Sequence, residues 1–275
     1  MGHQILSFTT SDGQKLFGQS WMVDKPVADL ILIHGVGEHS SRYQWSAEML
    51  NDKDISVHSF DLRGHGHSEG DRAYIDSFEQ FLEDVHTFIG QLQLEYDNFF
   101  LIGHSMGGLI VSRYLADHPE SNCKGVVLSA PALKVGDDIS PLLVKMSSII
   151  SSLFPKLKTT RLDSNFISRD PKVVEAYNAD PLVYHDGIKA RMGAEMIRTM
   201  TGMRGAYPAF KFPLLIMHGS GDKLADLQGS RWMVDEVTSD DKTLEVLPGF
   251  YHEILNEPEK EAVIQKIIKW ILDRI

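Results

Sequence analysis

A serine stands between two glycines where an apolar run gives way to apolar residues at helical spacing. The run is FFLI at 99–102 and the next residues are GHSMGG, so Ser105 lies between Gly103 and Gly107. A strand that turns this sharply into a helix strains the serine backbone, and neighbours without a Cβ let the adjacent chain approach closely. The pattern is typical of a nucleophile elbow at the carboxyl edge of a sheet. The plainer alternative is a glycine-rich packing turn.

A serine hydroxyl needs a base, and the base needs a carboxylate that orients it. In the fold that uses this elbow, the chain order is serine, acid, histidine. Asp222 follows the apolar run at 212–218 through a Gly-Ser-Gly turn, and His252 follows the next predicted strand. We therefore assign Ser105, Asp222 and His252 to catalysis. Asp226 is the rival acid, but its position is typical of a helix N-cap.

An oxyanion formed during attack on a carbonyl needs hydrogen-bond donors. His34-Gly35-Val36-Gly37 follows another apolar run, as the second donor loop of this fold should. We assign the backbone N–H groups of Val36 and Met106 to the oxyanion hole. The His34 side chain is expected to pack and fix the loop, and His218 is the alternative to His252 as base.

The segment DLRGHGHS at 61–68 allows a metal-site interpretation, because two histidines lie close together in it. No cysteine or second carboxylate cluster completes a ligand set with familiar spacing. We interpret the segment as a polar loop that supports the site, and we expect no metal.

Strands and helices must bring these candidate catalytic residues to one edge of a sheet. The stretch around Asp12-Gly13 is typical of a hairpin. Apolar runs without alternation are typical of strands covered on both faces, and helical stripes occur at 76–95 and 258–275. The alternation predicts an α/β fold with a mostly parallel sheet and flanking helices. The runs are ADLILIHG, ISVHSFDLRGHG, NFFLIGHS, KGVVLSAP, FPLLIMHGS and KTLEVLPG.

One long segment breaks the alternation. Residues 132–208 contain no convincing strand and are too long for a loop, so they predict a helical cap inserted into a core formed by 1–131 and 209–275. The first cap helix, at 140–154, has a mainly serine polar face. Its apolar stripe comprises Ile139, Leu142, Leu143, Met146, Ile149, Ile150 and Leu153.

Composition excludes some classes of partner. The chain has 275 residues, a formal charge of −11 and a pI of about 5.5, so long-range attraction to nucleic acid or an anionic membrane is not expected. The single cysteine, Cys123, excludes an intrachain disulfide and fits a cytoplasmic location. We expect no signal peptide, and no run of 18 apolar residues occurs.

Taken together, the motifs resemble the α/β-hydrolase superfamily, and more narrowly its monoacylglycerol lipase and lysophospholipase-like branch. The stretches that carry the resemblance are HGVGEHSSRY, DLRGHGHSEGDRAY, GHSMGG, YNADPLVYHDGIKA, HGSGDKLADLQGS and YHEILNEPE. The resemblance implies hydrolysis of a single acyl chain from glycerol or a similar alcohol, no cofactor, and a mobile cap that meets lipid aggregates.

The resemblance also implies residues that bind the glycerol end of the substrate. Glu38 and Arg42 lie in the first matching motif and Tyr177 in the cap motif, so these three are carried over as substrate-binding candidates. The alternative is that Glu38 and Arg42 form an ion pair that holds the loop. Arg63 departs from the residue type expected in some relatives.

We interpret the chain as a serine hydrolase that cleaves monoacylglycerols through an acyl-enzyme. A lysophospholipase or broad carboxylesterase would share the mechanism; a proline-releasing peptidase or a non-enzymatic binding module are further alternatives. Leu143 and Ile150 are expected to line an acyl tunnel or touch lipid, although packing within the cap is the usual role of such a stripe. We expect a lipid ester substrate, transient peripheral contact with lipid, and neither nucleic acid nor an obligate protein partner.

Overall fold

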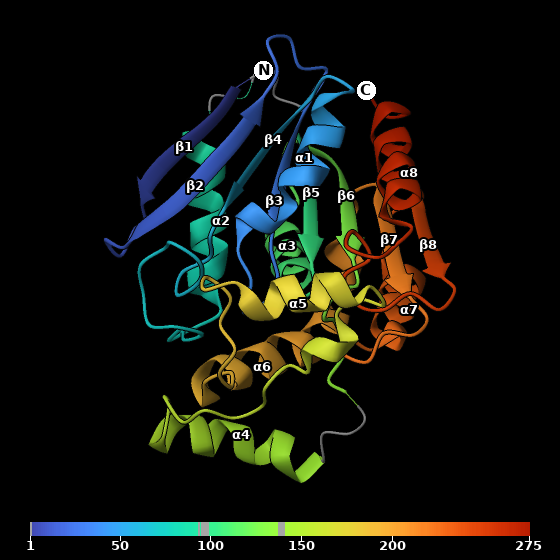
Figure 1. Cartoon of the computed structure of the whole chain (residues 1–275). Coiled ribbons are helices and arrows are strands. Elements are labelled where there is room, and N and C mark those ends of the chain that lie inside the picture. The colour runs from blue at the N-terminus through green and yellow to red at the C-terminus, as the bar shows by residue number, and fades with distance from the viewer. Residues whose placement is uncertain (1, 93, 95–98, 137–140) are drawn as a thin grey trace.

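An eight-stranded sheet forms the centre of the molecule (Figure 1). The computed structural model describes residues 2–92, 94, 99–136 and 141–275. The strand order is β1-β2-β4-β3-β5-β6-β7-β8; β1 pairs antiparallel with β2, β2 pairs antiparallel with β4, and the others are parallel. The strands are β1 Gly2–Thr9, β2 Lys15–Met22, β3 Ala28–Ile33, β4 Ile55–Phe60, β5 Phe99–His104, β6 Cys123–Ser129, β7 Leu214–Gly219 and β8 Lys242–Leu247.

Helices cover both faces of the sheet. On one face, α1 and α8 pack against strand residues in one apolar cluster, and on the other α2, α3 and α7 pack in a second. Every residue of β3, β4, β5 and β7 is buried, which explains their unbroken apolar runs. The helices are α1 Gln44–Asn51, α2 Glu79–Gln91, α3 Met106–Asp117, α7 Leu227–Glu236 and α8 Lys260–Leu272.

The predicted α/β fold with a mostly parallel sheet is confirmed, and so is the hairpin around Asp12-Gly13. The helices are shorter than the apolar stripes in the sequence suggested. The stripe at 76–95 forms α2 only over Glu79–Gln91, and residues 93 and 95–98 lie outside the described part of the chain. Among the described residues, no helix combines the length and apolar character needed to cross a bilayer.

The segment between β6 and β7, which we call the cap, lies over the carboxyl edge of the sheet (Figure 1). α6 packs against both α3 and α4, which leaves α4 on the far side of α6 from the sheet. This segment contains α4 Pro141–Leu153, η2 Ser164–Phe166, α5 Pro171–Ala179, α6 Ala190–Ala206 and η3 Tyr207–Ala209.

α4 turns Ser147 and Ser151 inward and most of its apolar stripe outward. Ser151 is 2% exposed, whereas Leu142 is 66% and Leu153 is 68% exposed; Met146 and Ile149 are exposed as well. The inward serines are satisfied within the helix, because Ser147 Oγ donates to the Val144 carbonyl at 2.7 Å and Ser151 Oγ to the Ser148 carbonyl at 3.0 Å.

The interpretation that the stripe packs within the cap, which is the usual role of such a stripe, is therefore wrong for the four exposed residues. Ile150 is half-buried. Ile139 and the side chain of Leu143 lie outside the described part of the chain. The sequence of a helix with serines on one face and aliphatic residues on the other does not reveal which face is buried. A serine whose hydroxyl bonds to its own helix can pack against the rest of the protein as a small residue.

This orientation predicts opposite responses on the two faces of α4. Leu153→Ser should change the free energy of unfolding by no more than about 0.5 kcal/mol, because the side chain is already in solvent. Ser151→Leu should destabilise by about 1–3 kcal/mol, because it adds volume against α6. Urea unfolding of both variants measures the difference; an equal loss would place the leucine face inward.

Candidate active site

Ser105 occupies a strained turn between β5 and α3. Its φ is 53° and its ψ is −118°, a conformation that L-residues rarely adopt. The surrounding backbone holds it: Ser105 N–H donates to the Ser129 carbonyl at 3.0 Å, and the Ser105 carbonyl accepts from the N–H groups of Gly108 and Ala132. The side chain is nearly covered, with the residue 8% exposed.

The two flanking glycines are required by close approach of neighbouring backbone. A Cβ on Gly107 would lie 2.1 Å from the Ile33 carbonyl oxygen, and one on Gly103 would lie 2.5 Å from the Gly107 carbonyl oxygen. Both distances are far inside van der Waals contact. The sequence argument for the glycines is therefore confirmed, and β3, β5 and α3 converge at the serine.

His252 and Asp222 are joined at the same edge of the sheet. His252 Nδ1–H donates to Asp222 Oδ2 at 2.8 Å, and Asp222 Oδ1 accepts from the N–H groups of Leu224 and Ala225. Burial alone would raise the pKa of Asp222, but His252 and His218 outweigh it and hold that pKa well below its usual value. Burial alone would lower the pKa of His252, and the Asp222 carboxylate raises it instead.

Of the two rival residues, His218 lies on the far side of the same carboxylate and Asp226 caps a helix. His218 is fully buried; Nδ1 is 2.8 Å from Ser230 Oγ, and Nε2 is 3.2 Å from both the Ala225 carbonyl oxygen and Asp222 Oδ2. Asp226 caps α7 by accepting from the Gln228 N–H and pairs with Lys134, so its interpretation as an N-cap is confirmed.

The loop after β3 is fixed by buried side chains. His34 bridges it, because Nδ1–H donates to the Gly35 carbonyl at 2.7 Å and Nε2 accepts from the Leu62 N–H at 2.9 Å. Burial lowers the pKa of His34, which keeps the ring neutral. Among the hydrogen bonds of the described residues, neither Val36 N–H nor Met106 N–H has an acceptor.

Glu38 and Arg42 belong to one buried cluster. Glu38 Oε1 accepts from the Gly35 N–H at 2.7 Å and the Tyr43 hydroxyl at 2.8 Å, and Glu38 Oε2 accepts from Arg42 at 2.8 Å. Arg42 also donates two hydrogen bonds to Glu253, and its guanidinium lies 4.8 Å from the centre of the Tyr177 ring. The pair thus holds the loop, whichever further role it has toward substrate.

Sequence reasoning missed two members of this site. Glu253 directly follows His252 and is buried, and the His104 ring lies 4.7 Å from the His252 ring, centre to centre. Burial lowers the pKa of His104 to about 4. The only signal for Glu253 was a carboxylate beside the predicted base, and nothing in the sequence pointed to its partner 211 positions away.

The 61–68 loop supports the β3 loop. Asp61 Oδ1 accepts from the Ser40 N–H and hydroxyl, Asp61 Oδ2 accepts from the His67 N–H, and the His65 ring packs on the His34 ring. Within the described residues, no group of three or more His, Cys, Asp or Glu side chains is arranged to hold a metal ion.

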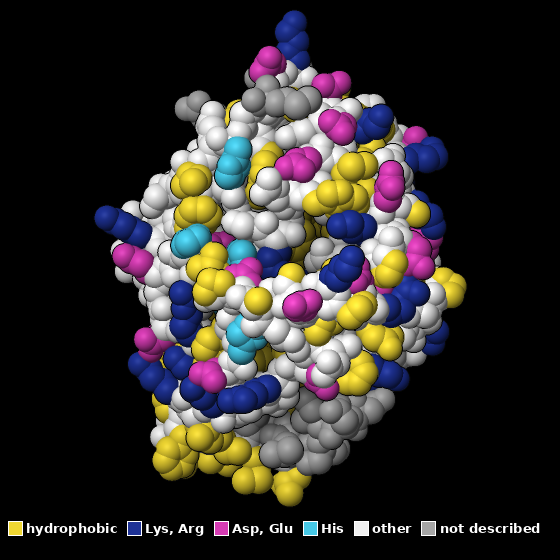
Figure 2. Space-filling view, in the orientation of Figure 1, with side chains coloured by type: hydrophobic (Ala, Val, Ile, Leu, Met, Phe, Trp, Pro, Cys, Tyr) yellow, Lys and Arg dark blue, Asp and Glu magenta, His cyan; other side chains and the backbone are white. Residues whose placement is uncertain are grey.

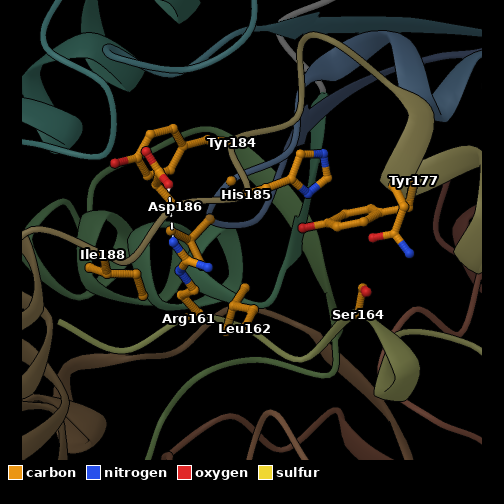
Figure 3. A pocket seen from close by; sticks show the side chains of 11 residues that line it. Arg161, Leu162, Ser164, Tyr177, Tyr184, His185, Asp186 and Ile188 are labelled. Atoms are coloured by element: carbon orange, nitrogen blue, oxygen red, sulfur yellow. Dashed lines mark hydrogen bonds and ion pairs between the residues drawn. The ribbon is translucent and has the colours of Figure 1, made fainter. Parts of the chain in front are cut away.

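A polar pocket of about 210 Å³ opens beside the β3 loop. Val36 and Gly37 form its core side, and cap residues around Tyr177 and His185 form the other. Figure 3 shows the Tyr177 and His185 rings near one another, with Arg161 and Asp186 joined across the pocket from them. Ile150 lies on α4 and does not line this pocket.

The sheet order, the strained serine turn and the Asp–His pair define an α/β-hydrolase. A family model described as serine aminopeptidase S33 matches residues 24–259. The chain is 36% identical to a monoacylglycerol lipase of Mycolicibacterium smegmatis (98% of this chain, 97% of that one) and 34% identical to a monoglyceride lipase of Rattus norvegicus (96% and 89%). A crystal structure of Paleococcus ferrophilus monoacylglycerol lipase superposes with a TM-score of 0.87 at 32% identity, covering 94% of this chain and 99% of that one. The chain therefore belongs to the monoacylglycerol lipase-like branch of that hydrolase family.

The close packing of backbone segments at Ser105 predicts that position 107 does not tolerate a side chain. Gly107→Ala should destabilise the fold by about 1–3 kcal/mol or more, because its Cβ would meet a strand carbonyl that cannot move alone. Gly202→Ala, on α6, is the matched control: a Cβ there meets nothing within 4 Å, so stability should hold or rise. Thermal unfolding compares the two, and a normal melting temperature for Gly107→Ala would contradict the packing argument.

Proposed function

We propose that this protein hydrolyses the ester bond of monoacylglycerols to glycerol and a free fatty acid. The observation that carries the proposal is the buried Asp222–His252 pair at the sheet edge where Ser105 occupies its strained turn. Near full-length similarity to proteins named monoacylglycerol lipases supports the choice of substrate.

In the proposed reaction, Ser105 Oγ attacks the ester carbonyl while His252 Nε2 takes the hydroxyl proton. Asp222 holds the Nδ1–H tautomer and stabilises the imidazolium. The N–H groups of Val36 and Met106 donate to the oxyanion. Glycerol leaves with the proton from His252, and water then repeats the cycle on the acyl-enzyme. Ser105 Oγ makes no hydrogen bond to His252 among the described contacts; this bond commonly tightens only when substrate binds.

The leaving alcohol needs a polar space next to the oxyanion loop. The pocket beside Val36 supplies it, and Tyr177 and His185 bring a hydroxyl and an imidazole into reach of glycerol oxygens. Glu38 and Arg42 lie beneath Tyr177, with their charges used to hold the loop. We propose that Tyr177 contacts glycerol directly and that the other two act through the loop they support.

A serine nucleophile makes a sharp prediction. Ser105→Ala should lower monoacylglycerol hydrolysis by roughly 10⁶-fold and abolish labelling by a fluorophosphonate probe. Ser112→Ala is the matched control, since Ser112 is a buried serine of α3 whose hydroxyl donates to the Gly108 carbonyl of its own helix at 2.7 Å and lies 3.8 Å from the Met233 sulfur.

The same assay tests the substrate. Monoacylglycerols, lysophospholipids and short esters are compared side by side on the wild-type protein. A preference for lysophospholipids would replace the proposed substrate while keeping the mechanism. Full activity of a folded Ser105→Ala variant would contradict both the proposed mechanism and the proposed function.

We further propose that the outer face of α4 contacts lipid. Its exposed apolar residues continue past the helix and gather at one end of the molecule, with Lys and Arg side chains beside them (Figure 2). Residues 139–162 hold four Lys or Arg and no Asp or Glu, and three of these cations, Lys156, Lys158 and Arg161, pair with Asp71 or Asp186 outside the segment. Such a segment favours an interface between water and lipid. The exposed apolar residues are Leu142, Met146, Ile149, Leu153, Phe154 and Leu157.

Lipid contact through this face predicts a loss confined to lipid substrates. Leu153→Ser with Phe154→Ser should weaken sedimentation with vesicles by about ten-fold and slow hydrolysis of long-chain monoacylglycerol, because two apolar side chains lose their burial in lipid. A short water-soluble ester should be cleaved normally. Ile5→Ser is the matched control, an equally exposed apolar residue (70%) on the edge strand β1. Equal losses on both substrates would contradict the proposal.

A further inference from the structure

The carboxylate next to the proposed base holds an arginine from another loop. Glu253 Oε1 accepts from Arg42 Nη1 at 2.6 Å and Glu253 Oε2 from Arg42 Nη2 at 2.7 Å, the two-pronged geometry of a strong guanidinium–carboxylate pair. Asn256 donates to Glu253 Oε2 at 2.9 Å. Glu253 is 6% exposed, and the Arg42 side chain is 10% exposed, so water screens the pair poorly.

Arg42 links two loops that must act together. One prong of its guanidinium also reaches Glu38, which accepts from the Gly35 N–H directly before Val36. The other end of the link is Glu253, directly after His252. A rigid chain of short hydrogen bonds thus connects the proposed oxyanion donor to the proposed base. The cap adds a second tether, because Glu253 N–H donates to the Ile167 carbonyl at 2.7 Å.

The cluster also carries a surplus of negative charge. It contains two buried carboxylates, Glu38 and Glu253, and one guanidinium, so one negative charge remains uncompensated within it. The other titratable groups that face His252 are Asp222, its charged partner, and His104, which burial keeps neutral.

We propose that Glu253 is a positioning residue for the hydrolysis: through Arg42 it keeps the His252 loop and the Val36 loop in register, and its carboxylate stabilises the His252 imidazolium that forms during attack. The proposal rests on the proposed role of His252 as base. Glu253 needs no contact with substrate to act, since both of its oxygens are already occupied by Arg42 and Asn256.

The carboxylates near His252 raise its pKa. Asp222 is the main group that raises the pKa of His252 against burial, and Glu253 and Glu38 add to it. Removing the Glu253 charge must therefore lower that pKa. His252 then stays neutral to lower pH, so the acid limb of the pH–rate profile, where activity falls as the base is protonated, moves to lower pH. The weaker base and the less stable imidazolium also lower the rate at the plateau of the profile.

The test uses Glu253→Gln in the full chain with a short water-soluble ester. We expect the acid limb of kcat/KM to move down by about 0.5–1 pH unit and kcat at the plateau to fall by about three- to ten-fold, with KM little changed. Arg42→Lys keeps the charge but loses the fork, so kcat should fall while the limb stays in place. Titration of the His252 ring by NMR gives the same pKa shift without any activity.

Asp84→Asn is the matched control. Asp84 is the buried, doubly bonded carboxylate of Arg63, which also holds a second carboxylate, Asp12, so this cluster copies the charges of the Arg42 cluster away from His252. Asp84→Asn should lower the melting temperature and leave the limb unmoved.

Three outcomes would overturn the proposal: a folded Glu253→Gln variant whose limb and His252 titration are unchanged, a variant with raised KM and normal kcat, or an Asp84→Asn variant that shifts the limb equally. A wild-type protein that cleaves no ester and takes no fluorophosphonate would refute the proposed function instead, and the NMR titration would still decide the charge effect of Glu253.

Discussion

The positive φ of Ser105 is held by close packing of three backbone segments, and the edge of the sheet is organised around it. Gly107 lies so near the end of β3 that no side chain fits between them, and Gly103 lies equally near the first turn of α3. Central strands of a parallel sheet are buried on both faces, so this convergence is rigid. The same packing brings the loop after β3 beside the serine, where its amides can face a reacting carbonyl.

The inner part of the cap is continuous with that edge. His252 N–H and Glu253 N–H donate to carbonyls of the cap at Phe166 and Ile167, and Tyr184 N–H donates to the Gly37 carbonyl. Three main-chain hydrogen bonds thus join the cap to the two core loops of the site. α4 makes its packing contacts with α6 instead, on the side away from the sheet. Moving η2 or Tyr184 away from the sheet would break hydrogen bonds to those loops, whereas moving α4 would leave these bonds intact.

The features that depend on residues close together in the sequence could be predicted from it. The buried strands, the turn at Ser105, and the placement of Asp222 and His252 after successive strands all follow from apolar runs, glycines and chain order. The partnership of Arg42 with Glu253 could not be predicted in this way, because it joins loops 211 positions apart and depends on side-chain direction. The outward face of α4 was equally hidden, since hydrogen bonds of serine to its own helix make a polar stripe suitable for burial.

The net charge of the whole chain also says little about lipid contact at one end of the molecule. The formal −11 describes the whole chain, but the predicted cap at 132–208 holds eleven Lys and Arg against eight Asp and Glu, which leaves the rest of the protein at −14. Charges in solution are screened over about 8–10 Å at physiological salt, so an approaching surface responds to the nearest residues rather than to the total. The α4 end presents exposed aliphatic residues, and three of the four basic residues of its segment are paired with Asp71 or Asp186. Because the segment between β6 and β7 lies over the carboxyl edge of the sheet, the exposed apolar face of α4 lies on the same side of the sheet as the turn between β5 and α3 that holds Ser105 (Figure 1).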